Sequence, residues 1–168
     1  MKKRKALRMK RFDYSSNGIY FITISVKGNK SLLGEVVDGV MVLNDIGLII
    51  EKWWKWLELK YEYVYLHDFV VMPNHFHGML QIKRDLAIDI KVKTLGSLIG
   101  AFKTVSTKEI NQLNDSLGDR FWHRNYYEYV IRNEKAYKNI SRYIKRNPEN
   151  WKKDKYNRNK NQDFIIIS

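Results

Sequence analysis

Residues 70–78 constrain the fold of this chain more than any other stretch. They read VVMPNHFHG, which is an apolar run, a Pro-Asn turn and two histidines separated by one residue. Pro and Asn favour a tight turn between two extended segments, and successive side chains of a strand point to opposite faces. The stretch therefore predicts two antiparallel neighbouring strands, the second of which places His75 and His77 on one face and Phe76 on the other.

These two histidines are half of a candidate metal site. Neutral imidazole binds divalent cations, and the remaining ligands have to come from elsewhere in the chain. Side chains that could supply them include Asp68, Gln81, Glu134 and Asn147. The spacing alone is equally typical of two surface or hydrogen-bonded histidines without a metal. Because the chain has no cysteine, a thiolate site and disulfide bonds are both excluded.

The rest of the chain alternates between strand and helix patterns. Asp38-Gly39 between two β-branched runs favours a hairpin, and Asn44 and Thr94 stand where an N-cap would precede a helical period. The strand patterns cover residues 19–26, 36–43, 64–72 and 75–83, and the helical patterns cover residues 44–60, 94–113 and 134–146. This order predicts a single α+β domain in which helices pack on an antiparallel β-sheet.

Each helical segment carries an apolar stripe that we expect to face the sheet. The first stripe is Ile46, Ile49, Ile50, Trp53 and Leu57, which leaves Trp54 and Trp56 outside it. The second is Leu95, Leu98, Phe102 and Val105, and the third is Ala136, Ile140, Tyr143 and Ile144.

The charge of the chain indicates a polyanionic partner. The 31 Lys and Arg residues exceed the 18 Asp and Glu residues by 13, a large excess for 168 residues. Nucleic acid is the first expectation, and an anionic membrane surface or a soluble basic protein without a specific partner are the alternatives. Seven of the cations lie in residues 1–11, which indicates a basic arm that lies along phosphates, or else a solubilising tail. We divide the chain into this arm, one domain (12–155) and a tail (156–168).

Nothing in the sequence indicates a membrane protein. No apolar run approaches the roughly 20 residues that a membrane-spanning helix needs. The basic N-terminus is not followed by the apolar segment of a secretory signal. We therefore expect no membrane association and a cytoplasmic location.

Aromatic and cationic residues are interleaved in residues 121–132, a composition typical of proteins that bind single-stranded nucleic acid. Bases stack on aromatic rings while Lys and Arg contact the backbone. A loop packed by its own aromatic side chains is the alternative. The candidate DNA-binding residues are Lys103, Arg124, Tyr126, Tyr127, Arg132, Arg142, Lys145 and Arg146, with Lys3, Arg4 and Arg8 in the arm.

A tyrosine is a candidate nucleophile. Without cysteine, covalent chemistry on phosphate falls to Tyr or Ser, and eleven tyrosines are present. Tyr143 and Asn147 are four residues apart in a helical segment, so that their side chains share a face. Both could meet a metal held by the two histidines, although the apolar stripe alone would make Tyr143 a core residue.

Three blocks in this order resemble one known family. VMPNHFHG at 71–78 resembles the HUH motif of the insertion-sequence tyrosine transposases, in which two histidines flank a hydrophobic residue. FWHRNYYE at 121–128, VIRNE at 130–134 and YIKRNP at 143–148 resemble its downstream blocks, and RFDYS at 11–15 with YFITI at 20–24 resembles its N-terminal block. The blocks resemble most the REP-associated branch of the family, over residues 8–155.

This resemblance implies a fold, a reaction and a substrate. The fold would be the HUH, or ferredoxin-like, single-strand nuclease fold. His75, His77 and Asn147 would hold Mg²⁺ or Mn²⁺, and Tyr143 would attack the scissile phosphate to form a 5′-phosphotyrosine link and free a 3′-OH. The substrate would be single-stranded DNA beside a hairpin, and the protein would associate with the bacterial nucleoid when bound to DNA. It would act as a monomer, or as a homodimer in which each tyrosine helix serves the partner's histidines.

Two other functions remain open from the residues. One is a non-catalytic basic module that binds nucleic acid and has the same fold. The other is a metal hydrolase for a small phosphate ester, which the charge of +13 and the lack of a Gly-rich phosphate loop disfavour.

Overall fold

The computed structural model describes residues 17–85, 87 and 89–157. The predicted arm, with Lys3, Arg4 and Arg8, lies outside the described residues, as does most of the predicted tail. The strands are β1 (Gly18–Ser25), β2 (Gly34–Val37), β3 (Val40–Leu43), β4 (Val64–Val71), β5 (His75–Ile82) and β6 (Tyr127–Ile131). The helices are α1 (Asp45–Lys60), α2 (Leu95–Leu113) and α3 (Glu134–Arg146), with short 3₁₀ turns η1 (Lys27–Asn29) and η2 (Trp151–Lys153).

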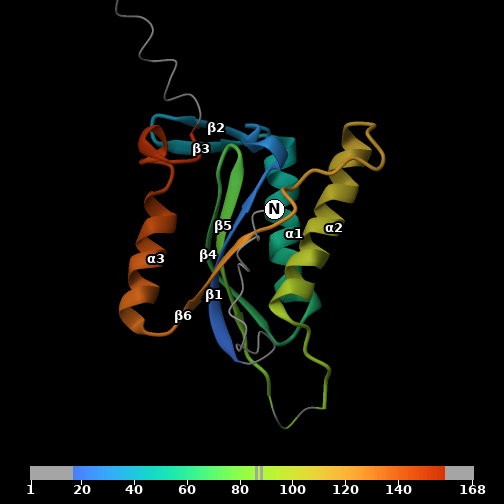
Figure 1. Ribbon diagram of the computed structural model, residues 1–168, viewed down its shortest axis with the longest axis vertical. Coiled ribbons are helices and arrows are strands. Elements are labelled where there is room, and N and C mark those ends of the chain that lie inside the picture. Colours follow the sequence, from blue (N-terminus) through green and yellow to red (C-terminus); the bar gives the residue numbers. More distant parts are fainter. Residues whose placement is uncertain (1–16, 86, 88, 158–168) are drawn as a thin grey trace, which may run out of the picture.

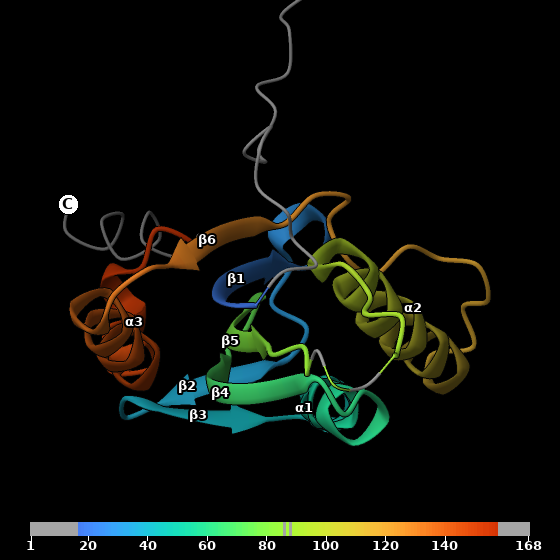
Figure 2. The same ribbon diagram turned by 90° about the horizontal axis from the view of Figure 1, so that it is seen from below.

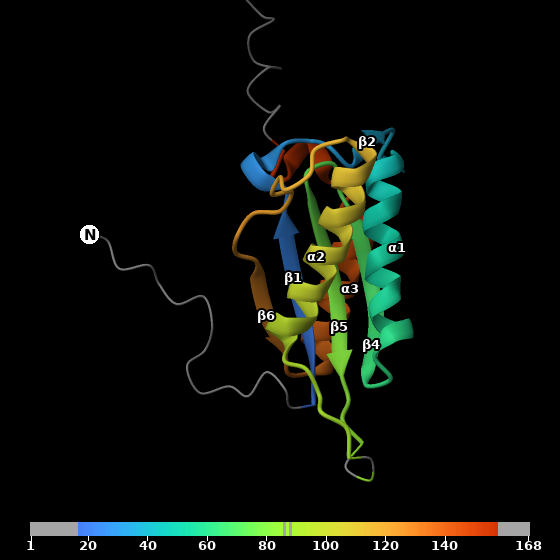
Figure 3. The same cartoon turned by 90° about the vertical axis from the view of Figure 1, so that its right-hand side faces the viewer.

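A four-stranded antiparallel sheet organises the molecule. Its strand order is β4-β5-β1-β6, while β2 and β3 form a separate hairpin. Helices α1 and α2 lie side by side on one face of the sheet, and α3 lies on the other (Figures 1 and 2). Figure 3 shows α1 and α2 covering their face. The expected single α+β domain with an antiparallel sheet is confirmed.

Strand β5 serves both faces of the sheet at once. Phe76 points to the α1/α2 side, where its ring lies 4.6 Å from that of Trp54 and 5.8 Å from that of Phe102. Gly78 follows on the same side, and a Cβ there would stand 2.8 Å from the Trp54 ring, so the glycine makes room for the indole. His75 and His77 point to the α3 side, as the alternation predicts.

The capping predictions are confirmed by hydrogen bonds. The Asn44 side chain accepts from the backbone N–H of Gly47 at 3.0 Å, and Thr94 accepts from Ser97 at 3.2 Å. The predicted Asp38-Gly39 hairpin is the connection between β2 and β3. None of the helices in the described ranges is long and apolar enough to cross a membrane.

The predicted stripes of two helices each leave out a residue that is fully buried, although Trp53 of the first stripe packs, partly buried, against the core. In α1 the buried tryptophan is Trp54, not Trp53, whose Nε1 instead donates to Glu109 at 2.6 Å. In α2 the buried position is Ser106 rather than Val105. The Ser106 hydroxyl accepts from Nε1 of Trp122 at 3.0 Å, so a polar side chain fits the core because it satisfies a buried indole.

Strand β6 was not predicted. It pairs with β1, with Tyr127 opposite Thr23 and Tyr129 opposite Phe21, and forms an edge of the sheet. The connection before it is fixed to the end of β1, because the His123 backbone N–H donates to Ser25 at 2.8 Å. The aromatic segment is thus an edge strand and its lead-in, not the loop considered from the sequence.

A candidate active site on the α3 face of the sheet

The candidate site lies where β1, β5 and α3 meet. The strand register places His77 opposite Thr23 and His75 opposite Ser25. The two imidazole rings are 4.5 Å apart, and their Nε2 atoms are 3.0 Å apart. Both side chains are almost completely buried.

Asn74 fixes the orientation of His75. The Asn74 amide donates from Nδ2 to the carbonyl oxygens of Asn29 and Tyr156, so its Oδ1 faces Nδ1 of His75 at 2.8 Å. A carbonyl oxygen only accepts, so Nδ1 of His75 must be the donor. In neutral His75, Nε2 therefore carries the lone pair that points into the site.

Thr23 holds the other imidazole. Its hydroxyl lies 2.7 Å from Nδ1 of His77. Because a hydroxyl can donate or accept, it accommodates either tautomer of His77. When it accepts, Nε2 of His77 also presents a lone pair, and two lone pairs 3.0 Å apart suit a shared cation. When it donates, Nε2–H of His77 can donate to Nε2 of His75 instead.

Tyr143 reaches this pair from α3. Its hydroxyl lies 3.3 Å from Nε2 of His77, and its ring packs against those of His77 and Phe21. The side chain is 43% exposed, so the interpretation of Tyr143 as a core aromatic is wrong. Partial burial, followed by the charge of Asp154, raises the pKa of the Tyr143 hydroxyl, and the Asn147 amide acts in the opposite direction.

Asn147 lies one turn further along, at the end of α3. It keeps helical backbone angles (φ −58°, ψ −44°) and is buried, so it is not frayed. Its Oδ1 is buried and has no hydrogen-bond partner in the described part of the chain. A buried oxygen without a partner is costly unless a ligand satisfies it. This atom therefore fits a bound cation.

Asp154 is a further candidate ligand that the sequence did not reveal. Within the described residues, ligand atoms of His75, His77 and Asp154 all lie within 4.8 Å of one another. The carboxylate follows Pro148 and η2, beyond any helical spacing from Tyr143. The one signal was its position as an acid in the basic stretch 142–160.

The other ligands considered from the sequence have different partners. Asp68 accepts from the Ser141 hydroxyl and pairs with Lys145 at 3.4 Å. Gln81 lies 3.1 Å from His67, and Glu134 pairs with Lys138 at 2.8 Å. Among the described residues, neither Asp68 nor Glu134 belongs to the group of ligand atoms around His75 and His77.

Burial keeps both histidines neutral. Desolvation, followed by the charge of Lys155, lowers the pKa of His75 to about 3. Desolvation, then His75 and Lys155, also lowers the pKa of His77 well below its usual value. Neutral imidazoles have the free lone pairs that metal binding requires.

The segment after α3 covers the histidines and leaves a cleft beside them. The Tyr156 ring stacks on His75 at 4.3 Å, and Trp151 lies 6.0 Å away. The cleft has a volume of about 480 Å³ and is lined by Tyr143, Asn147, Asn150, Lys153, Asp154 and Lys155. Its basic lining next to the Tyr143 hydroxyl suits a phosphate group.

The candidate DNA-binding residues lie on two sides of the molecule. Lys103 and Arg124 share a pocket beside α2, whereas Arg142, Lys145 and Arg146 are exposed on α3. Tyr126 and Tyr127 line a smaller cleft together with Tyr156. Arg132 is exposed at the turn between β6 and α3. The structure thus places these candidates on separate surfaces and does not form them into one patch.

Comparisons with known proteins show similarity in sequence and in fold. The model of the family described as "Transposase IS200 like" matches residues 42–147, which include β5 and α3. An uncharacterized protein of Haemophilus influenzae is 35% identical over 166 residues, covering 90% of this chain and 91% of its own. The structure of a REP-associated tyrosine transposase bound to a REP hairpin superposes with a TM-score of 0.64 at 18% identity, over 86% of this chain and 73% of that one. At that identity the superposition shows a shared fold.

Proposed function

This chain belongs to the IS200-like transposase family, and from that premise we propose that it is a metal-dependent transposase of single-stranded DNA that cleaves and rejoins strands through a 5′-phosphotyrosine link. One observation carries the proposal. The Tyr143 hydroxyl lies 3.3 Å from Nε2 of His77, beside a second imidazole and a buried amide oxygen that has no partner among the described residues. A nucleophile and a set of cation ligands therefore meet at one point.

We propose that His75, His77, Asn147 and Asp154 hold Mg²⁺ or Mn²⁺. Two imidazole nitrogens and two oxygens suit such a divalent cation. When bound, the cation would supply a Lewis acid that polarises a phosphate oxygen and stabilises developing negative charge.

The protein residues would carry out the transfer itself. The Tyr143 oxygen attacks the scissile phosphorus, a P–O bond to tyrosine forms, and the P–O3′ bond breaks. The phenolic proton passes to water, which the 43% exposure of Tyr143 permits, and water returns a proton to the leaving 3′ oxygen, which becomes the free 3′-OH. Lys153 and Lys155 in the cleft would position the phosphate before the attack. Attack by another 3′-OH reverses these steps and joins strands without a high-energy cofactor.

The proposed substrate is single-stranded DNA beside a hairpin. The excess of 13 positive charges favours a polyanion. The REP-associated transposase that shares this fold was solved with a REP hairpin, which supports the same substrate class here. Because Tyr143 contacts His77 of its own chain, we also propose that one chain completes the site as a monomer.

The test is the covalent adduct. Wild-type protein incubated with end-labelled hairpin-bearing oligonucleotides and Mn²⁺ is expected to give a protein-linked product on a denaturing gel. Tyr143→Phe is expected to abolish the adduct and to leave DNA binding unchanged, because only the attacking oxygen is lost. Tyr65→Phe, which removes the hydroxyl of an exposed tyrosine on β4, is the matched control and should form the adduct normally.

The outcomes separate the possible functions. An adduct that persists in Tyr143→Phe would overturn the assignment of the nucleophile. DNA binding without any adduct in the wild type, across a panel of hairpins with Mg²⁺ and Mn²⁺, would instead favour the non-catalytic binding module.

A further inference from the structure

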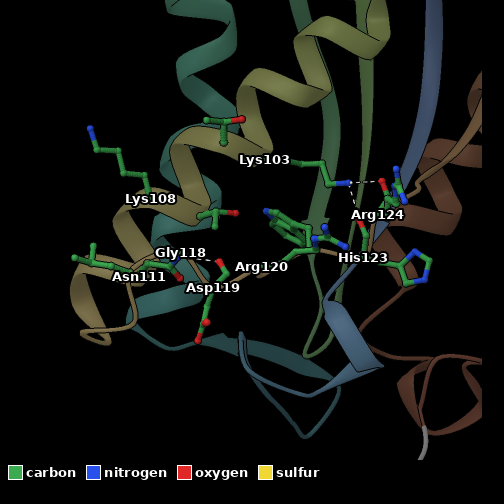
Figure 4. Close-up of a pocket in the computed structure, with 12 residues that line it drawn as sticks. Lys103, Lys108, Asn111, Gly118, Asp119, Arg120, His123 and Arg124 are labelled. Atoms are coloured by element: carbon green, nitrogen blue, oxygen red, sulfur yellow. Dashed lines mark hydrogen bonds between the residues drawn. The ribbon is translucent and has the colours of Figure 1, made fainter.

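A basic pocket lies on the α2 side of the molecule, away from the tyrosine helix. It has a volume of about 530 Å³ and lies between α2 and the connection at residues 117–124 (Figure 4). Lys103, Thr107 and Lys108 line it from α2, and Arg120, His123 and Arg124 line it from the connection. None of these residues belongs to the group around His75.

The lining of this pocket carries more positive than negative charge. Four cations line it, Lys103, Lys108, Arg120 and Arg124, and Asp119 is the one acid among its lining residues. In Figure 4 the Asp119 carboxylate points away from Lys103 and Arg124. None of the four cations forms an ion pair within residues 17–85, 87 and 89–157, whereas Lys52, Lys55, Lys138 and Lys145 on other surfaces do.

Lys103 is a partly buried cation of this pocket, and its ammonium group is held in place by hydrogen bonds. Its Nζ donates to the backbone carbonyls of His123 at 2.7 Å and Arg124 at 3.3 Å, which fixes the ammonium group at the end of the pocket. Burial, followed by the charge of Arg120, lowers the pKa of Lys103 to about 8. A bound anion would offset the cost of burying the charge of Lys103 and the repulsion between Lys103 and Arg120.

The pocket is connected to the candidate active site. His123 lines the pocket and also a neighbouring cleft of about 230 Å³. That cleft includes Thr23, which bonds His77, and Tyr156, which stacks on His75. Asn125, Tyr126 and Tyr127 also line this cleft. Amide and aromatic side chains therefore connect the basic pocket with the candidate active site.

We propose that this pocket binds the backbone phosphates of an unpaired DNA strand that flanks the cleavage site. The inference rests on the proposed function and adds a subsite to it. Strands without base pairs bind where cations follow the backbone and aromatic rings offer stacking faces, and Tyr126 and Tyr127 provide those faces along the way.

The test compares two charge-matched double variants in the Tyr143→Phe background, so that cleavage plays no part. One is Lys108→Gln with Arg120→Gln in the pocket; the other is Lys55→Gln with Lys60→Gln on α1. Binding of a fluorescent single-stranded oligonucleotide without a hairpin is measured by anisotropy over a series of KCl concentrations. The pocket variant should bind roughly tenfold more weakly at low salt, and its slope of log K against log salt should fall by about 0.7 for each phosphate that it no longer neutralises.

The control variant should lose less affinity than the pocket variant. Equal losses in both would overturn the proposal, because they would show a response to net charge alone. A larger loss for blunt duplex than for the single strand would overturn the assigned occupant, as would a wild-type protein that does not bind the single strand. Thermal unfolding checks that both variants fold. The adduct assay on the wild type is independent, so failure of the proposed function is seen separately.

Discussion

At the scale of single residues, the proposed chemistry depends on two histidines that the fold keeps uncharged. In the metal-free protein the pKa of His75 is about 3, against a usual value of 6.5 that applies when the chain unfolds. Between these values the unfolded chain takes up a proton that the folded one refuses. The stability contributed by neutral His75 is therefore complete above pH 6.5 and is lost as the pH falls toward 3. His77 acts in the same direction.

We expect this loss to be measurable by urea unfolding in the presence of EDTA. Each histidine can contribute a slope of up to about 1.4 kcal/mol per pH unit. Between about pH 7.5 and about pH 5, a range that spans the usual histidine pKa, His75→Gln should lose less stability than the wild type, because one of the two groups is absent. His123→Gln, at an exposed position, should follow the wild type. A His75→Gln variant with the wild-type pH dependence would show that the buried imidazole is not its cause.

Much of the site could be anticipated from residue spacing. The i, i+2 rule for strands placed His75 and His77 together, and the i, i+4 rule for helices placed Asn147 beside Tyr143. Spacing could not find Asp154 or Tyr156, because the chain reaches them through a turn after Pro148 that no periodicity describes. It also could not decide whether Tyr143 was buried, since that depends on how far α3 stands from the sheet.

At the scale of elements, the helix that carries Tyr143 is held by polar contacts as well as by a small apolar cluster. Ile144 is its one buried residue. Asp68 on β4 accepts from Ser141 and pairs with Lys145, and His67 lies 2.9 Å from the Tyr137 hydroxyl. Ile144 lies in a small apolar cluster with Phe21 and Met79, and the side-chain contacts add polar anchors that help to fix where α3 stands.

We therefore expect Asp68→Ala to loosen α3. The loss of a charge-assisted hydrogen bond of about 1.5 kcal/mol should speed amide exchange in α3 roughly tenfold, with α1 unaffected, and should slow adduct formation without weakening metal binding. Glu51→Ala removes a carboxylate that pairs with Lys55 on α1. It should change neither the amide exchange of α3 nor the rate of adduct formation. Unchanged exchange in α3 of Asp68→Ala would show that apolar packing alone holds the helix.

Helix ends and hairpins were the most predictable elements, because caps and turn residues act locally. The edge strand β6 escaped prediction because its pairing with β1 is non-local and its exposed Tyr127 and Tyr129 resemble a loop composition. The choice of Trp54 over Trp53 escaped for a related reason. The space left by the missing side chain of Gly78, on β5, is filled by the indole of Trp54. The sequence of α1 alone does not contain this information.

At the scale of the whole molecule, the excess of positive charge should dominate DNA affinity. Seven cations lie in residues 1–11, and we propose that they bind further phosphates as an arm. Deletion of these residues should lower the slope of log K against log salt by about 0.7 for each phosphate of a single strand that the arm binds. Adduct formation at saturating DNA should persist. If the deletion variant has the same salt dependence of binding as the full chain, residues 1–11 do not bind phosphates and act as a solubilising tail.

The alternation of side chains along β5 restricts which insertions and deletions this protein can accept during evolution. Because His75 and His77 face α3 while Phe76 and Gly78 face α1 and α2, insertion of one residue would exchange the two sets. An imidazole would then enter the apolar layer and a phenyl ring would occupy the place of a ligand, so fold and chemistry would fail together. Inherited insertions and deletions should therefore avoid residues 71–82 and collect in the connection between β5 and α2, where a change of chain length does not change what faces Tyr143.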